Sequence, residues 1–142
     1  MGTDDKGPVF GNYQWEDYRS VNSDVENLAT GMMSLKLCPE VEGDGKMWRF
    51  VGIWSQNRPE WAKTLLACMH YNMTTVGFYD AMGASQVDYI LNQTEMTTVF
   101  CTANYAKKIF EMQEQGMAHR IKNLVLIGVE SIDAALTQKG EA

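Results

Sequence analysis

The stretch VGIWSQNRPEW at residues 51–61 decides the fold, because an apolar run changes within a few residues into the start of a helix. Residues 49–54 are mostly apolar and predict a short buried strand. Asn57 is of a residue type that caps helices, and Pro59 suits the first helical turn. We therefore expect a strand, a tight turn and then a helix over residues 59–71.

Outside this unit, β-rich runs alternate with amphipathic patterns of helical spacing. Strands are expected near residues 74–79, 97–102 and 123–128, and helices near 21–35, from 83 onward and near 105–115. Ser85 and Asp88 have the spacing of a capping box at the start of the second of these helices. Residues 40–46 are expected to form a surface loop. Strands that alternate with helices indicate βαβ units, whose right-handed crossovers place helices on both faces. The sequence predicts an α/β fold with an open, mostly parallel sheet, a Rossmann-like layer.

Length and composition predict one globular domain that works inside the cell. The chain has 142 residues, of which 45% are hydrophobic and 21% charged, and its formal net charge is −6. This mild acidity argues against nucleic acid as a partner, and no apolar run approaches the length of a membrane span. Three scattered cysteines fit a reducing compartment, and the start of the chain lacks the pattern of a signal peptide. We expect a loose arm at residues 1–12, an α/β subdomain at 13–130 and a frayed polar tail at 131–142.

Ligands of open α/β sheets bind beyond the carboxyl ends of the strands. The candidates there are residues 55–58, 79–83, 102–104 and 128–130. None contains the glycine-rich loop through which backbone N–H groups approach phosphate, which argues against nucleotide binding by this chain alone. Arg58 could meet an anion, but pairing with Glu60 or exposure to solvent is the favoured interpretation.

Other single residues point to chemistry only weakly. Asp80 could ligate Mg²⁺ or accept a phosphoryl group as in receiver domains, but no acid pair accompanies it and a turn role is favoured. Cys68 and His70 lie two residues apart on a predicted helix and point in different directions, which argues against a metal site. His119 is expected on the surface and Cys101 in the core. We therefore predict no catalytic and no metal-binding residues in this chain.

Residues 51–61 resemble the V-G-I-x-S-x-N-R-P-E-W segment of long-chain acyl-CoA synthetases, which are adenylate-forming enzymes. Further segments resemble that family in order and spacing: YQWEDY at 13–18, YDAMG at 79–83 and YILNQTE at 89–95. One departure is VGF at 76–78, where the family usually has Val-Pro-Leu. The resemblance runs from about residue 10 to residue 128 and implies the first part of the large N-terminal domain of such an enzyme.

The resemblance also implies an activity for the intact enzyme. Such an enzyme joins a long-chain fatty acid to ATP, with Mg²⁺, and passes the acyl group from the acyl-adenylate to coenzyme A. In the family the loop that grips ATP, the later nucleotide motifs and the catalytic lysine lie beyond this segment, so we expect the chain alone to be inactive and to hold no cofactor. The residues that match family motifs are expected to be structural: Asn57, Arg58, Pro59, Glu60, Tyr79 and Asp80.

The resemblance sets the expected partners and location as well. The partners are the remainder of the parent enzyme and, in the intact enzyme, the fatty acid. The location is the cytoplasm or the cytosolic face of an organelle membrane. A piece of a larger domain should also expose a sheet edge and self-associate. The alternative is a stand-alone α/β binding or interaction domain without catalysis, for which we expect a clean monomer.

Overall fold

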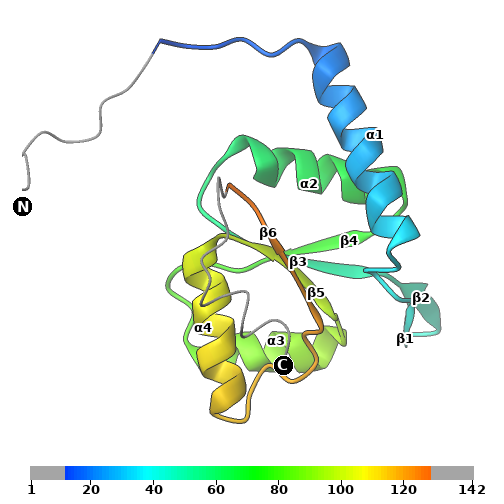
Figure 1. Cartoon of the computed structure of the whole chain (residues 1–142). Coiled ribbons are helices and arrows are strands. Elements are labelled where there is room, and N and C mark those ends of the chain that lie inside the picture. Colours follow the sequence, from blue (N-terminus) through cyan, green and yellow to red (C-terminus); the bar gives the residue numbers. More distant parts are fainter. Residues whose placement is uncertain (1–11, 129–142) are drawn as a thin grey trace, which may run out of the picture.

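The computed structural model describes residues 12–128 and is centred on a parallel sheet. The sheet has the strand order β4-β3-β5-β6, and all neighbouring strands run parallel (Figure 1). Its strands are β3 (Phe50–Trp54), β4 (Thr74–Gly77), β5 (Thr98–Cys101) and β6 (Asn123–Leu126). The predicted parallel α/β sheet is confirmed. The expected arm at 1–12 (all but its last residue) and the expected tail at 131–142 lie outside the described residues.

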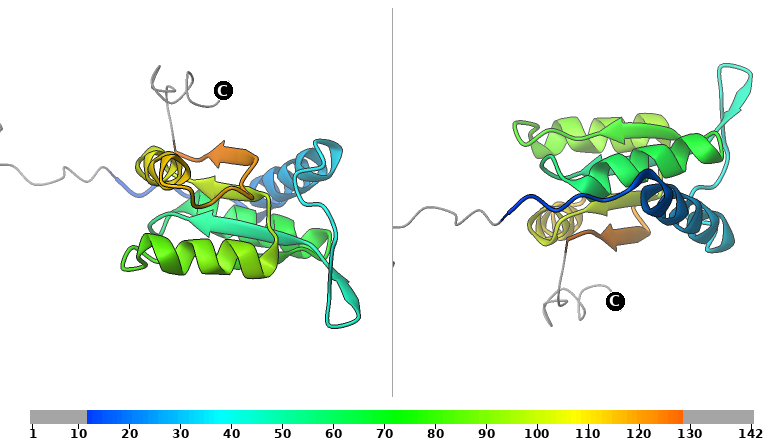
Figure 2. Two further views of the ribbon diagram at one scale, coloured as in Figure 1. Left: turned by 90° about the horizontal axis from the view of Figure 1, so that it is seen from below. Right: turned by 90° about the horizontal axis from the view of Figure 1, so that it is seen from above.

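Two helices cover each face of the sheet. The helices α1 (Tyr18–Ser34) and α2 (Pro59–His70) lie on one face, whereas α3 (Ala84–Thr94) and α4 (Ala103–Glu114) lie on the other. Figure 2 shows α3 and α4 over the sheet when it is seen from below, and α1 and α2 when it is seen from above. The predicted placement of helices on both faces is confirmed.

The sheet separates two apolar clusters, because successive strand residues point to opposite faces. Trp54 and Val99 belong to the cluster under α3 and α4, whereas Val51 and Phe100 belong to the cluster under α1 and α2. Gly52 lies on β3 between these side chains, where a Cβ atom would stand 2.8 Å from Phe78 Cε2 and 2.9 Å from Val99 Cγ2. The centre of the sheet is therefore packed without space for even one more methyl group.

A β-hairpin replaces the predicted surface loop at residues 40–46. Its strands are β1 (Val41–Gly43) and β2 (Lys46–Trp48), which pair antiparallel. Asp44 and Gly45 both have positive φ, +52° and +70°, which is the pattern of a two-residue type I′ turn. The prediction of a loop was wrong because it gave weight to the polar and glycine residues and not to the Asp-Gly pair as a hairpin signal.

Two helix starts also differ from the prediction. The residue before α3 is Gly83, whose backbone N–H donates to Gln86 Oε1 at 3.1 Å, so the cap does not lie at Ser85. The residue before α2 is Arg58, in an extended conformation, and no side chain caps that helix, so the predicted cap at Asn57 is wrong. Pro59 does occupy the first turn of α2, where a missing N–H costs nothing.

Candidate functional site

The polar residues of interest lie at the edge of the sheet where the parallel strands end. We call this edge the carboxyl rim and define it as residues 55–60, 79–83, 102–105 and 128. All four strands of the parallel sheet end here, so segments far apart in the sequence come together (Figure 1). The rim therefore unites the segments that the sequence singled out, as far as residue 128.

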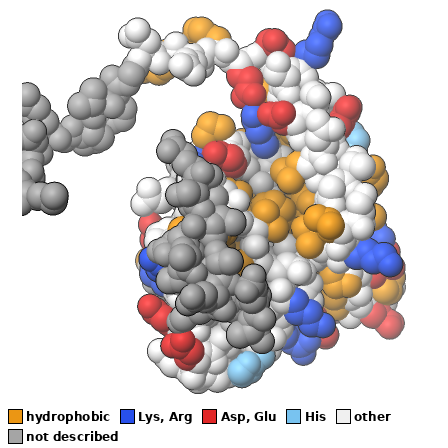
Figure 3. All heavy atoms as spheres, viewed as in Figure 1, with side chains coloured by type: hydrophobic (Ala, Val, Ile, Leu, Met, Phe, Trp, Pro, Cys, Tyr) orange, Lys and Arg blue, Asp and Glu red, His pale blue; other side chains and the backbone are white. Residues whose placement is uncertain are grey.

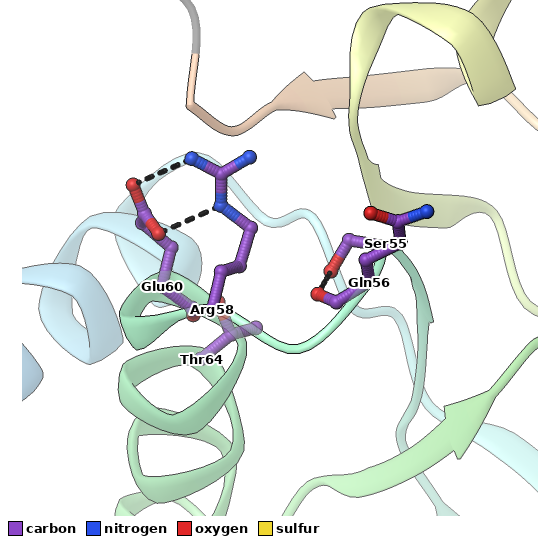
Figure 4. A network of polar contacts seen from close by, with 5 residues as sticks. All are labelled: Ser55, Gln56, Arg58, Glu60 and Thr64. Atoms are coloured by element: carbon purple, nitrogen blue, oxygen red, sulfur yellow. Dashed lines mark hydrogen bonds and ion pairs between the residues drawn. The ribbon is translucent and has the colours of Figure 1, made fainter. Parts of the chain in front are cut away.

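Arg58 and Glu60 form a bidentate ion pair on the rim (Figure 4). Arg58 Nε donates to Glu60 Oε2 at 2.8 Å, and Arg58 Nη2 donates to Glu60 Oε1 at 3.2 Å. This pairing lowers the pKa of Glu60 and raises the pKa of Arg58 from their usual values. Of the three sequence-based alternatives for Arg58, the structure shows pairing with Glu60. This carboxylate neutralises much of the positive charge that an anion would meet.

The Arg58 guanidinium also lies against the chain where it leaves β6. A Cβ atom built on Gly128 would stand 1.9 Å from Arg58 Nη2 and 2.1 Å from its Cζ, so only a glycine fits beneath the guanidinium. Gly128 also has φ +65°, a conformation that L side chains rarely adopt. Arg58 thus links the turn between β3 and α2 to the segment that follows β6.

The turn between β3 and α2 is held by its own local contacts. Thr64 Oγ1 donates to the carbonyl of Glu60 at 2.7 Å, one turn back along the helix, and the Thr64 side chain is buried. Ser55 Oγ donates to the carbonyl of Gln56 at 3.0 Å (Figure 4). Asn57 is exposed. These contacts hold the turn and the helix start.

A second polar contact joins the end of β4 to helix α4. The Tyr105 hydroxyl donates to Asp80 Oδ1, and the Tyr105 ring stacks on Trp54 with centroids 4.9 Å apart. Burial and then the bond to Asp80 raise the pKa of Tyr105. Tyr79, the neighbour of Asp80, is instead 71% exposed. The structure thus ties Asp80 to an aromatic residue that the sequence reasoning placed only in a helix.

Lys108 extends this aromatic group. Its ammonium lies 5.0 Å from the Tyr105 ring centroid and 5.9 Å from that of Trp54. Lys108 follows Tyr105 by three positions on α4, so the helical spacing could have indicated that both side chains share a face. Trp54 Nε1 is buried, and it has no hydrogen-bond partner among the described residues.

One hollow near the rim is open rather than enclosed. It has a volume of about 590 Å³ and lies between the end of β4 and the first turns of α3. It is lined by Tyr79, Ala81, Met82, Ser85, Gln86, Tyr89 and Ile90. No charged side chain lines it, so it offers shape and apolar contact but no acid, base or metal ligand.

The cysteines and histidines do not assemble a reactive or metal site in the described part of the chain. Burial raises the pKa of Cys38 to about 11 and the pKa values of Cys68 and Cys101 to about 12, so their thiols are poor nucleophiles. His119 is exposed, as expected. Residues 12–128 contain no group of three or more His, Cys, Asp or Glu side chains placed to hold a metal ion. Over the same residues, no helix is both long and apolar enough to cross a bilayer.

Several solved structures have a fold similar to that of this chain. A long-chain-fatty-acid–CoA ligase from Archaeoglobus fulgidus superposes with a TM-score of 0.65 at 17% identity, over 96% of this chain and 25% of that one. A fatty acyl CoA synthetase from Mycobacterium tuberculosis superposes with a TM-score of 0.64 at 16% identity, over 89% of this chain and 23% of that one. At these identities the likeness shows the fold.

Sequence comparison adds relatives and a family. Long-chain-fatty-acid–CoA ligase 5 of Rattus norvegicus is 30% identical over 148 aligned positions, which cover 99% of this chain and 20% of the relative. Fatty acyl-CoA synthetase A of Dictyostelium discoideum is 29% identical over 72% of this chain and 14% of its own length. The chain thus spans about a fifth or less of the relatives it matches. The profile of the AMP-binding enzyme family matches residues 2–141, and this chain therefore belongs to that family.

Proposed function

We propose that this chain is the N-terminal part of a long-chain fatty acid–CoA ligase. The observation that carries the proposal is the run at residues 51–61, which forms one strand-turn-helix unit and resembles the same run in that group. Its support is the 30% identity to a long-chain-fatty-acid–CoA ligase over 99% of this chain. The intact enzyme would activate a long-chain fatty acid with ATP and transfer the acyl group to coenzyme A, at a cytoplasmic or organelle-surface location.

In this proposal the segment is a scaffold and the nucleotide site lies outside it. The two acids of the rim are already engaged, Glu60 by Arg58 and Asp80 by Tyr105. The rim segments also contain no glycine-rich loop of the kind whose backbone N–H groups hold phosphate. ATP, Mg²⁺ and coenzyme A would bind to the remainder of the parent enzyme, which this segment would support by packing.

The test is an exchange of segments within a characterised relative. The matching fifth of the rat long-chain-fatty-acid–CoA ligase 5 is replaced by this chain, and acyl-CoA formation from palmitate is measured. We expect the chimera to form palmitoyl-CoA, whereas the same ligase with the segment deleted does not. A chimera that folds, as judged by circular dichroism, but forms no acyl-CoA would contradict the proposal.

A second assay separates the fragment from an enzyme in its own right. The chain alone is incubated with palmitate, Mg²⁺, ATP and labelled pyrophosphate. We expect no fatty-acid-dependent exchange of label into ATP, because the rim segments contain no glycine-rich loop that would hold the phosphates. Exchange by the chain alone would overturn the scaffold role, and an immunoblot of source cells with a single band near 16 kDa would favour a stand-alone domain.

A further inference from the structure

The first half of helix α1 is attached to the domain less firmly than its second half. Val25, Ala29 and Met32 of the second half are buried, whereas residues 12–24 include no buried residue. We call residues 12–24 the entry segment. Val21 is the one residue of this segment that packs against an apolar cluster, the cluster under α1 and α2. Burial of apolar surface, the main stabilising contribution to a fold, therefore does little to hold the entry segment in place.

The aromatic side chains of the entry segment do not attach it to the domain either. Tyr13 and Trp15 are each 97% exposed, and Tyr18 is 94% exposed. Asp17 Oδ1 accepts a hydrogen bond from the backbone N–H of Ser20 at 2.8 Å, which caps the start of α1. This cap stabilises the helix itself and makes no contact with another element. The position of the entry segment must therefore depend on other contacts.

Two carboxylates of the entry segment converge on one lysine of α2. Lys63 Nζ donates to Glu16 Oε1 at 2.8 Å and to Asp24 Oδ2 at 2.6 Å. Figure 3 shows acidic side chains beside a basic one in the area where Figure 1 draws the start of α1 above α2. Glu16 precedes α1 and Asp24 lies in its second turn, so one ammonium group holds both the chain that enters the helix and the helix itself. Among residues 12–128, these two ion pairs are the polar contacts that join the entry segment to another element.

The strength of this link depends on the salt concentration. The Lys63 side chain is 20% exposed, but those of Glu16 and Asp24 are 44% and 53% exposed. The hydrogen bonds to Asp24 and Glu16 raise the pKa of Lys63, so its ammonium group is charged at neutral pH. Ion pairs with such exposed partners are individually weak, and dissolved salt screens them. The link therefore favours the attached state of the entry segment without making it permanent.

We propose that Lys63 is an electrostatic clasp, which holds the entry segment on α2 and releases it when the ionic strength rises. On release, residues 12–24 open as one unit, because both of their carboxylates lose the same partner. The sheet and the second half of α1 stay folded, since the two apolar clusters are untouched. The clasp thus determines where three exposed aromatic side chains lie relative to α2. It depends only on the contacts between α1 and α2 and is independent of the ligase assignment.

The first test is amide hydrogen exchange of the 142-residue chain, followed by NMR at about 0.02 M and about 0.5 M salt. At low salt, the amides of residues 21–24 should exchange about three- to tenfold faster in Lys63→Met than in the unmodified chain, relative to the amides of residues 29–32. High salt should bring the unmodified chain to the exchange rate of Lys63→Met and should change that variant little. The matched control is Arg120→Met, which removes the ion pair with Glu95 and should leave residues 21–24 unchanged.

A second variant keeps the test sharp even if Lys63→Met disturbs the packing of α2. Asp24→Asn changes a half-exposed side chain and should also accelerate exchange at residues 21–24. The double variant should exchange no faster than Lys63→Met alone, because both substitutions remove the same link. Trypsin gives an independent measurement, since Arg19 lies in the first turn of α1 and its cleavage should be accelerated about as much as the exchange. Exchange at residues 21–24 that responds to neither substitution nor salt, or effects that add in the double variant, would overturn the proposal.

Discussion

The centre of the sheet and its carboxyl rim are built on different physical principles. At the centre, Gly52 and Phe100 lie among side chains that fill all available space, and shape decides which residue fits. On the rim, Arg58 is held by Glu60 and rests on Gly128, so charge and backbone conformation decide. The centre should therefore respond to changes in side-chain volume, and the rim to changes in pH and in backbone conformation.

The largest effect is expected at the centre, from Phe100→Ala. Phe100 is 1% exposed and fills the cluster under α1 and α2, so its truncation leaves a cavity that the sheet cannot close. We expect a loss of about 3–5 kcal/mol in the free energy of unfolding, measured by urea denaturation at low protein concentration. The control Phe100→Leu should lose less than half of that amount. A loss below about 1 kcal/mol for Phe100→Ala would contradict the close packing of the centre.

The opposite change, added volume, should also be felt at the centre. In Gly52→Ala the new methyl group would lie 2.8 Å from Phe78 Cε2 and 3.1 Å from Met96 Sδ, so these side chains must shift. We expect a loss of about 2 kcal/mol by the same measurement. Gly77→Ala on β4 is the matched control, since nothing lies within 4 Å of its Cβ position, and it should be nearly neutral. Equal losses for both variants would show that strand propensity and not packing is responsible.

On the rim, Gly128→Ala should combine backbone strain with loss of the Arg58 contact. The positive φ alone should cost about 1–2 kcal/mol, and the methyl group displaces the guanidinium from Glu60. The pKa of Glu60, followed by NMR titration, should therefore rise toward its usual value. Gly45→Ala is the control, because Gly45 also has positive φ, +70°, but no atom within 4 Å. Gly45→Ala should lose similar stability and leave the pKa of Glu60 unchanged. A rise of the pKa of Glu60 in this control would contradict the role of the contact between Arg58 and Gly128.

The smallest effect is expected from the ion pair itself, in Glu60→Gln. The folded pKa of Glu60 is lowered below 4.5, so its contribution is present at neutral pH and is lost as the pH falls below that value. Because both side chains are partly exposed, we expect at most about 1 kcal/mol. Between about pH 6 and pH 3, the free energy of unfolding should fall less steeply with decreasing pH for Glu60→Gln than for the unmodified chain. Parallel curves would exclude a role for this pair in acid stability.

The sequence predicted the sheet well because its strands are short apolar runs separated by clear helix signals. The run at residues 49–54 could be recognised as a buried strand, and Pro59 indicated where α2 begins. The hairpin at residues 41–48 was missed because its strands are only three residues long and its side chains are half-exposed or exposed. The remaining signal for the hairpin was the Asp44-Gly45 pair at its turn, which was not weighed as one.

The candidate site was predictable in place but not in its contacts. The carboxyl ends of the strands could be located, and Arg58 with Glu60 could be considered as a pair from their spacing. The contact between Tyr105 and Asp80 could not, because 25 residues separate them and the pairing depends on how Tyr105 of α4 stacks on Trp54 at the end of β3. The contact between Arg58 and Gly128 could not be predicted either, because it joins segments 70 positions apart in the sequence, 128 minus 58.

The strand order β4-β3-β5-β6 also has a consequence for the synthesis of the protein on the ribosome. Of the four strands of the parallel sheet, β3 is translated first. The strand β4 then adds to one side of β3, β5 adds to its other side, and β6 adds to β5. Each new strand thus finds an edge already waiting, and no strand must be inserted between two that have paired. The four-stranded sheet can therefore assemble in the order in which its strands are translated.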